Sequence, residues 1–438
     1  MRKIFAVLSI AVLLLVLSAS AEEALKSGNW YFRILEDGTA EITDYEGNAK
    51  TLDIPSELDG HKVTRLGEKA LKDCWDLISV TIPEVVTSIC CLAFSWCPLL
   101  TSVTMPEGVT SIGDQVFFCC EDLTSVILPD SVRSIGANPF YACDRLAEIK
   151  VSPEHEYLAV IDGVLFSKPD GRLIYCPYGK DGEYFIPQGT RAIEESAFHG
   201  CGNLTSVLIP DSVTSIGVYA FYGCYNLSSI TIPDSVTTIG EGAFYWCDSM
   251  ASVTIPGSVS EITEDAFSHC SSLTSVMISD GVTSIGSYAF DSCGSLTSIT
   301  IPDSVTSIGE AAFYDCHSLE SVNIPDSVTS IDNSVFYCCS SLNSITIPDG
   351  VTSIGDWTFF GCSSLTSVTI PEGVTSIGEG AFTDCSSLTA VTIPESVTSI
   401  PYGAFIFCPA ELVITVPRDS YAEQYCKYSG LNYTYPES

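Results

Sequence analysis

The residues of this chain best suited to chemistry are cysteines that recur every 23 residues. Each stands three positions after an apolar residue, nearly always phenylalanine, as Cys316 stands after Phe313. Aligned thiols can form disulfides, bind zinc or act as nucleophiles. The column has four members before residue 150 and ten after it: Cys74, Cys97, Cys120, Cys143, Cys201, Cys224, Cys247, Cys270, Cys293, Cys316, Cys339, Cys362, Cys385 and Cys408.

The spacing favours buried structural thiols. If successive repeats stack as strands do, neighbouring cysteines lie about 5 Å apart, which is within disulfide range. A straight column, however, does not offer zinc a tetrahedral ligand set. Because free cysteine is among the most buried residue types, we predict a column of core thiols and no metal site. Disulfides remain an alternative, with the better candidates outside the column: Cys90, Cys91, Cys119, Cys176, Cys338 and Cys426.

A second column places a carboxylate directly after a recurring proline, as in Pro302-Asp303. Like charges one repeat apart repel within the Debye length of about 8 Å, and calcium would relieve that repulsion. Turn preferences explain aspartate there equally well, and the column lacks D-x-D spacing. We predict no cofactor, with calcium as the alternative for Glu84, Glu107, Asp130, Asp211, Asp234, Asp280, Asp303, Asp326, Asp349, Glu372 and Glu395.

Nothing else in the sequence indicates catalysis. The histidines have no helical or hairpin spacing, and no two of them share a repeat: His61, His155, His199, His269 and His317. The chain contains no glycine-rich phosphate loop and no arrangement typical of a Ser-His-Asp triad. We therefore predict that the protein is not an enzyme; an active site would have to lie in a cap or an insertion.

A repeat of 23 residues must position these columns, and 296–318 is a typical copy, LTSITIPDSVTSIGEAAFYDCHS. The first part alternates as a short half-buried strand does, until Pro302 ends it. A second short extended piece follows, Gly309 breaks it, and the spacing of Phe313 and Cys316 predicts a helical or 3₁₀ turn back to the next strand. Since no unit can bury its apolar face alone, we predict a solenoid of about 14 stacked coils. The core positions of this unit are Leu296, Ile299, Ile301, Val305, Ile308, Phe313 and Cys316.

The pattern L-x-x-[VI]-x-I-P-[DE]-x-V-T-x-I-G-x-x-A-F-x-x-C resembles the repeat of the BspA-like leucine-rich repeat surface proteins. The likeness covers roughly residues 52–417, and the segment around Asp37-Gly38 is similar to the opening of these proteins. The resemblance implies a mainly β leucine-rich repeat fold with short 3₁₀ or helical turns. It also implies adhesion to matrix or cell-surface components.

The chain divides into six predicted segments. Residues 1–21 combine a basic start, an apolar run and a small-residue cleavage site, so we predict a secretory signal peptide and no membrane insertion after its removal. Residues 22–70 form an N-terminal cap, 71–150 and 187–417 are repeats, and 151–186 are a β-hairpin insertion. Residues 418–438 form a C-terminal cap, with Asp419 as N-cap of a helix over 420–428 and Gly430 at its end. The insertion is either part of the binding face or a tolerated decoration.

Charge limits the partners. The whole chain has a net charge of −36, and without Arg2 and Lys3 the remaining 16 basic and 54 acidic residues give −38. Nucleic acid and anionic membranes need a basic footprint, so both are excluded. We expect a secreted or cell-surface protein that binds extracellular or host-surface proteins non-covalently, and adhesion is the predicted role. Glycan binding and a structural scaffold of the cell surface are the alternatives.

Any specificity must come from positions that vary or face outward. Aromatic residues follow the phenylalanine anchor, and exposed aromatics are enriched where proteins bind, although these rings could instead pack over the neighbouring turn. Serine and threonine line the outer side of the first strand. The predicted ligand-facing residues are Tyr222, Tyr245, Trp246, Ser298, Thr300, Glu310, Tyr314, Asp315, Tyr337 and Phe360.

Overall fold

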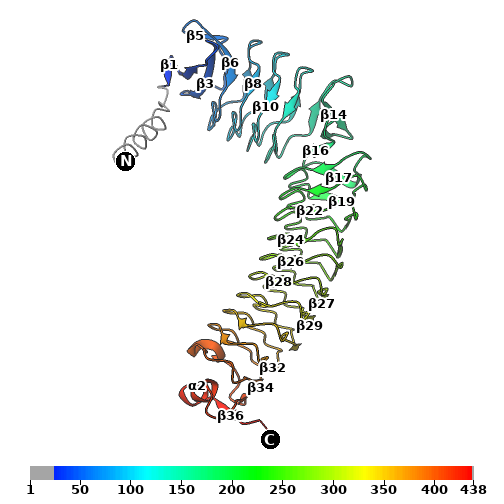
Figure 1. Ribbon diagram of the computed structural model, residues 1–438. Coiled ribbons are helices and arrows are strands. Elements are labelled where there is room, and N and C mark those ends of the chain that lie inside the picture. The colour runs from blue at the N-terminus through cyan, green and yellow to red at the C-terminus, as the bar shows by residue number, and fades with distance from the viewer. Residues whose placement is uncertain (1–23, 437–438) are drawn as a thin grey trace, which may run out of the picture. The chain divides into compact units, whose positions relative to one another are not determined.

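The computed structural model describes residues 24–436, so the predicted signal peptide lies outside the described residues. The chain separates into two compact units, residues 1–143 and 144–438, and each is described by itself. Both consist of stacked coils with short strands (Figure 1). Over the described residues the solenoid has about 17 turns of about 23 residues each. This number exceeds the 14 counted from the phenylalanine column, which does not include the turns of the caps and insertion.

The first unit begins with an antiparallel cap that turns into a parallel ladder. β1 (Leu25–Ser27), β2 (Trp30–Ile34) and β3 (Ala40–Tyr45) are antiparallel neighbours. β3 then pairs in parallel with β6 (His61–Leu66), and β5 (Glu57–Leu58) pairs antiparallel with the first residues of β6. β6 begins the ladder of β8 (Ser88–Ile89), β10 (Ser111–Ile112) and β12 (Ser134–Ile135). The principal strands are β4 (Thr51–Asp53), β7 (Ser79–Thr81), β9 (Ser102–Thr104) and β11 (Ser125–Ile127).

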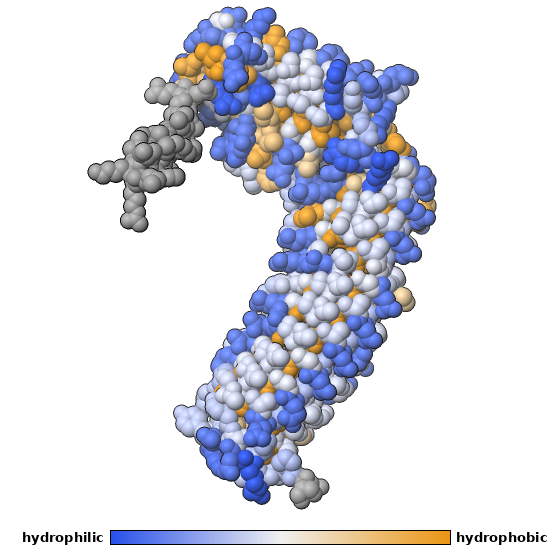
Figure 2. Space-filling view, in the orientation of Figure 1, coloured by the Kyte–Doolittle hydropathy of each residue, from blue (hydrophilic) through white to orange (hydrophobic). Residues whose placement is uncertain are grey.

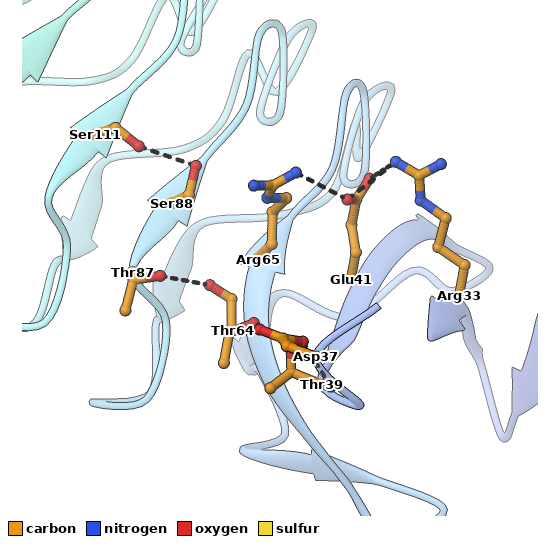
Figure 3. Close-up of polar contacts among 9 residues, drawn as sticks. All are labelled: Arg33, Asp37, Thr39, Glu41, Thr64, Arg65, Thr87, Ser88 and Ser111. Carbon is orange, nitrogen blue, oxygen red and sulfur yellow. Dashed lines mark hydrogen bonds and ion pairs between the residues drawn. The ribbon is translucent and has the colours of Figure 1, made fainter. Parts of the chain in front are cut away.

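A buried carboxylate locks this cap to the first coil (Figure 3). Glu41 on β3 is 5 % exposed, and both its oxygens lie 3.1 Å from Nη2 of Arg33 on β2. Its Oε2 also lies 3.6 Å from Nη1 of Arg65 on β6. Because a buried charge is costly unless it is paired, the two arginines offset the cost of burying Glu41 between the cap and the first coil.

The second unit opens with the insertion. After β13 (Glu148–Lys150), β14 (Leu158–Ile161), β15 (Val164–Ser167) and β16 (Arg172–Tyr175) form antiparallel pairs. The predicted hairpin is therefore present as β15 and β16, with β14 as a further strand that the sequence did not indicate. All four residues of β15 are buried, and β16 pairs in parallel with the next coil, so the insertion is built into the solenoid.

Two kinds of parallel ladder run through the rest of this unit. The principal strands are β17 (Asp181–Phe185), β19 (Asn203–Leu208), β21 (Ser229–Thr231), β23 (Ser252–Ile255), β25 (Ser275–Ile278), β27 (Ser298–Thr300), β29 (Ser321–Asn323), β30 (Ser344–Ile345), β32 (Ser367–Thr369), β34 (Ala390–Thr392) and β35 (Val413–Thr415). The second strands are β18 (Ala192–Ile193), β20 (Ser215–Ile216), β22 (Thr238–Ile239), β24 (Glu261–Ile262), β26 (Ser284–Ile285), β28 (Ser307–Ile308), β31 (Ser353–Ile354) and β33 (Ser376–Ile377).

Identical positions stack because every coil has the same length. Ser298 pairs with Ser321, and Ile299 pairs with Val322, a shift of one repeat in each case. The anchor phenylalanines form nearly parallel stacks, with ring centroids from 4.8 Å to 5.7 Å apart. All are buried, and with the leucine, isoleucine and valine columns they form the core.

The return segment is a run of tight turns that also bonds to the next coil. Within one coil, the amides of Ala312, Tyr314 and Cys316 donate to carbonyls three residues earlier, as in a 3₁₀ helix. The intervening amides donate to carbonyls of the following coil, as Phe313 does to Val335 at 3.0 Å. Ala311 and Asp315 have positive φ values of 54° and 51°. Among the described residues a regular 3₁₀ helix, η1 (Tyr402–Phe405), forms in the last coil.

The C-terminal cap is a helix followed by a strand. α2 (Tyr421–Ser429) ends at Gly430, whose φ of 71° is left-handed, as predicted. The prediction of Asp419 as N-cap was wrong: Ser420 accepts the hydrogen bond from Glu423 N, and Glu423 in turn accepts from Asp419 N at 2.6 Å. This reciprocal arrangement resembles a capping box moved outward by one residue. β36 (Asn432–Thr434) adds to β35 and closes the ladder.

Candidate recognition surface

The structure places the predicted ligand-facing residues on three separate parts of the coil. Ser298 and Thr300 lie on principal strand β27, and Glu310 follows second strand β28. The remaining residues lie in return segments. The structure therefore does not gather them into one site.

The aromatic residues after the anchor stack on one another. Ring centroids are 4.7 Å apart for His199 and Tyr222 and 5.4 Å apart for Tyr222 and Tyr245. A second stack joins Tyr314, Tyr337 and Phe360, with spacings of 4.5 Å and 4.6 Å. These rings are half-buried, which agrees with packing over neighbouring turns. Their edges and the more exposed Trp246 are what remains for a ligand.

Asp265 and Asp291 lie in the coils between the two ring stacks, and the pKa values of both are raised. Burial, together with Glu264, Asp291 and Glu241, raises the pKa of Asp265 to about 6. Burial also raises the pKa of Asp291, whose Oδ2 lies 3.6 Å from Nε2 of His269. Within residues 24–436 no group of three or more His, Cys, Asp or Glu side chains has the arrangement of a metal site.

On the outer face of the principal strands most hydroxyl groups are not hydrogen-bonded within the described residues, whereas elsewhere in the coil many hydroxyls donate to backbone carbonyls. Thr306, outside that face, donates its hydroxyl to Thr283 O at 3.3 Å, and most threonines of its column do the same. The hydroxyls of Ser298 and Thr300 are exposed and make no hydrogen bond to another described residue. They are available to an external partner.

The sequence reasoning did not identify the apolar members of this face. Phe185, Leu208 and Met277 are 62 %, 52 % and 63 % exposed, and all three occupy the column of Thr300. Phe185 pairs directly with Leu208, and the side chains around them form a shallow depression of about 220 Å³. Figure 2 shows a weakly polar strip with apolar spots along the repeats of this unit, between more polar margins. The signal in the sequence was the departure of these three positions from the usual threonine.

The cysteine column is part of the core. Every member is buried except Cys408, which is partly exposed, and the twenty cysteines carry free thiols. The Sγ of Cys316 donates to Phe290 O of the preceding coil at 3.1 Å, and the same bond recurs along the column. That carbonyl already accepts from Cys293 N, so the thiol satisfies its second lone pair. Burial raises the pKa of Cys270 to about 12, which disfavours the reactive thiolate.

His199 is a packed member of the first ring stack. Burial lowers the pKa of His199 to about 4, and its Nδ1 lies 3.0 Å from Tyr178 Oη. A neutral, stacked imidazole of this kind supports packing.

The acidic column that includes Asp303 is exposed along the turns.

Comparison with known proteins agrees with this architecture. A family model described as the BspA type leucine rich repeat region matches residues 64–168, 191–318 and 283–411. The chain belongs to this family. The predicted resemblance and the predicted leucine-rich repeat fold are therefore confirmed. None of the curated proteins compared with the chain matches it.

Several solved bacterial structures have the same fold. A leucine rich cell surface protein from Faecalibacterium prausnitzii is 28 % identical, with 96 % of this chain and 97 % of that chain covered and a TM-score of 0.50. A leucine-rich repeat protein from Bacteroides ovatus is 23 % identical, with 94 % and 100 % covered and a TM-score of 0.52. One from Eubacterium ventriosum is 22 % identical, with 86 % and 95 % covered and a TM-score of 0.56. In this chain, no helix within residues 24–436 has the length and apolar character needed to cross a membrane.

Proposed function

We propose that this BspA-type repeat protein acts at the outer surface of a bacterial cell and binds a surface or matrix protein of a host or neighbouring cell. The observation that carries the proposal is the open outer face of the principal strands around Phe185 and Leu208. The similar protein from Faecalibacterium prausnitzii, described as a cell surface protein, supports the location.

The composition of this face suits a protein partner. An exposed phenylalanine beside an exposed leucine offers apolar area that contacts water in the free protein and that a partner can bury. The surrounding serine and threonine hydroxyls can pair with backbone or side-chain groups of a partner lying across several coils. The net charge of −36 favours partners with basic surfaces.

The contacts of the insertion favour the strand face as the binding surface. Arg172 forms ion pairs with Asp170 and Glu194, at 2.6 Å and 3.5 Å. Lys168 Nζ donates to His155 O, and Lys180 Nζ donates to Asp162 O at 2.7 Å. Since these basic groups are engaged within the chain, they are less available to a partner than the exposed face of β17, the last strand of the insertion.

The test is binding of the exported chain to a panel of immobilised matrix proteins. A double substitution, Phe185→Asp with Leu208→Asp, should weaken the binding at least about tenfold, because it places charge at the centre of the contact. Phe407→Asp is the matched control, since Phe407 is 77 % exposed but lies in a return turn. Binding that is equal for the double variant and the control would refute the assignment of this face.

A further inference from the structure

A separate hollow lies at the C-terminal end of the second unit, between η1 with the last coil and α2. Its volume is about 280 Å³, near the lower limit of small-molecule sites, which is about 300 Å³. Figure 1 shows α2 next to the last coils. The lining residues are Ile400, Tyr402, Tyr421, Gln424, Tyr425 and Tyr428.

One face of α2 supplies most of the lining. Tyr421, Gln424, Tyr425 and Tyr428 are spaced by three and four residues, so they share one side of the helix. Tyr425 anchors that side: it is 8 % exposed, and its Oη donates to Tyr402 O at 3.3 Å. The hollow therefore has a fixed floor.

The walls of the hollow are tyrosine rings with unused polar groups. Tyr402 and Tyr428 are 67 % and 83 % exposed, and their rings meet at 79° with centroids 6.4 Å apart. The hydroxyls of Tyr402, Tyr421 and Tyr428 and the side-chain amide of Gln424 make no hydrogen bond to another described residue. Exposed rings with free hydroxyls are ready to contact a ligand.

The lining carries no formal charge, in a chain with 54 acidic residues. The charged residues of α2 are engaged elsewhere: Lys427 Nζ lies 2.7 Å from Glu423 Oε1, which also accepts from Tyr435 Oη. An anion would find no cationic group in the hollow. A cation could contact the tyrosine rings but would find no carboxylate, so the free phenolic hydroxyls and the Gln424 amide are what favour a neutral, hydroxyl-rich ligand.

We propose that this hollow, defined by Tyr402, Tyr421, Gln424 and Tyr428, binds one or two rings of a neutral saccharide. The apolar C–H face of a pyranose stacks on a tyrosine ring, while its hydroxyls bond to the free phenolic hydroxyls and to the Gln424 amide. This site is distinct from the strand face around Phe185, so either can hold without the other.

The test is a screen of the full exported chain against an array of neutral oligosaccharides, with sialylated and cationic counterparts included. The strongest neutral binder is then titrated calorimetrically into the protein and its variants. Tyr402→Ala with Tyr428→Ala should weaken binding at least about tenfold. The corresponding double substitution to phenylalanine should weaken it less, because the rings remain. Tyr225→Ala, at another exposed tyrosine of the same unit, should leave it unchanged.

Three results would overturn the proposal. They are the absence of any neutral saccharide binding at millimolar concentration, a preference for the charged ligands, and equal affinity of the alanine double variant and the parent. Thermal unfolding of each variant checks the fold, and sedimentation checks self-association. A double variant that changes only self-association would assign the hollow to a contact between copies.

Discussion

At the scale of single residues, small side chains satisfy the backbone of the neighbouring coil. The thiol of Cys316 completes the hydrogen bonding of Phe290 O, and the hydroxyl of Ser304 does the same for Val282 O at 2.7 Å. Both groups reach one coil back. The thiol bond recurs along the cysteine column, whereas the serine bond is made by Ser131, Ser212, Ser235, Ser258, Ser304 and Ser327 and is absent where glycine takes that position. In these coils a side chain therefore supplies a donor to a backbone carbonyl of the preceding coil.

Replacing one thiol should show what the column contributes. Cys316→Ala removes a buried donor and leaves a small void, so the free energy of unfolding should fall by about 1–3 kcal/mol. Urea denaturation measures the change. Cys338→Ala is the control, because Cys338 is only partly buried, and it should change stability by less than about 0.5 kcal/mol. Equal effects of the two substitutions would contradict a role for the thiol hydrogen bond.

The pH dependence of Asp265 gives a second residue-level prediction. Its pKa of about 6 in the folded protein lies above its ordinary value of 3.8, so the folded state holds the proton more tightly. This contribution to stability is present at low pH and is lost as pH rises through about 6. Asp265→Asn should therefore raise the melting temperature at pH 7 by about 1–3 °C, a small shift because the side chain is partly solvated.

The difference between Asp265→Asn and the parent should disappear below about pH 3, where the carboxyl is protonated in both the folded and the unfolded state. Melting curves recorded across this pH range test the prediction. Asp384→Asn, another residue with positive φ in a distant coil, is the control. A gap that stays constant with pH would show that the titration of Asp265 does not affect stability.

At the scale of elements, the return segment combines two left-handed residues with alternating bonds inside and between coils. Ala311 and Asp315 hold these left-handed positions, and glycine holds the second one in other coils, at Gly200, Gly223 and Gly361. A side chain with a β carbon is strained there by about 1–2 kcal/mol, so packing must offset that cost.

Substitutions at Asp315 should distinguish the effect of backbone strain on stability from the effect of side-chain contacts. Asp315→Val should lower the free energy of unfolding by about 1–2 kcal/mol, since a branched side chain tolerates positive φ poorly. Asp315→Gly should be neutral or stabilising. Glu310→Val, at an exposed position with negative φ in the same segment, is the control. A loss of stability from the glycine variant would show that the aspartate side chain matters.

The secondary-structure elements could be predicted from the sequence wherever successive repeats carry the same residue types at the same positions. The strands, the proline turn and the buried columns follow from a period that places like residues together. The left-handed positions were not identified, because Ala311 and Asp315 are not glycine; the signal in the sequence was the glycine at the position equivalent to Asp315, at Gly200, Gly223 and Gly361. Asp419 and Ser420 are both good N-caps, so sequence alone could not choose between them. The exposure of Phe185 and the tyrosine hollow depend on tertiary packing that no single repeat contains.

At the scale of the whole molecule, stability should be a sum over coils and their interfaces. Deleting residues 296–318 removes one full period, and β25 can then pair with β29 in the same register. The shortened chain should fold, with a smaller dependence of unfolding free energy on denaturant because less surface is exposed. Circular dichroism and urea titration measure both. Deleting only residues 296–307 is the control; it shifts the register and should prevent cooperative unfolding.

The bonds between coils join each coil to the next, so a pull on the two ends of the array loads all of the interfaces in series, and a terminal coil is held by a single neighbour. The terminal coil should unfold first, while the other coils remain folded. Each released repeat of 23 residues adds about 76–83 Å of chain, since an extended residue spans about 3.3–3.6 Å. A protein anchored at one end and attached to a partner at the other would thus lengthen in equal steps under load. This lengthening would limit the tension on the contact with the partner, so that the partner stays bound.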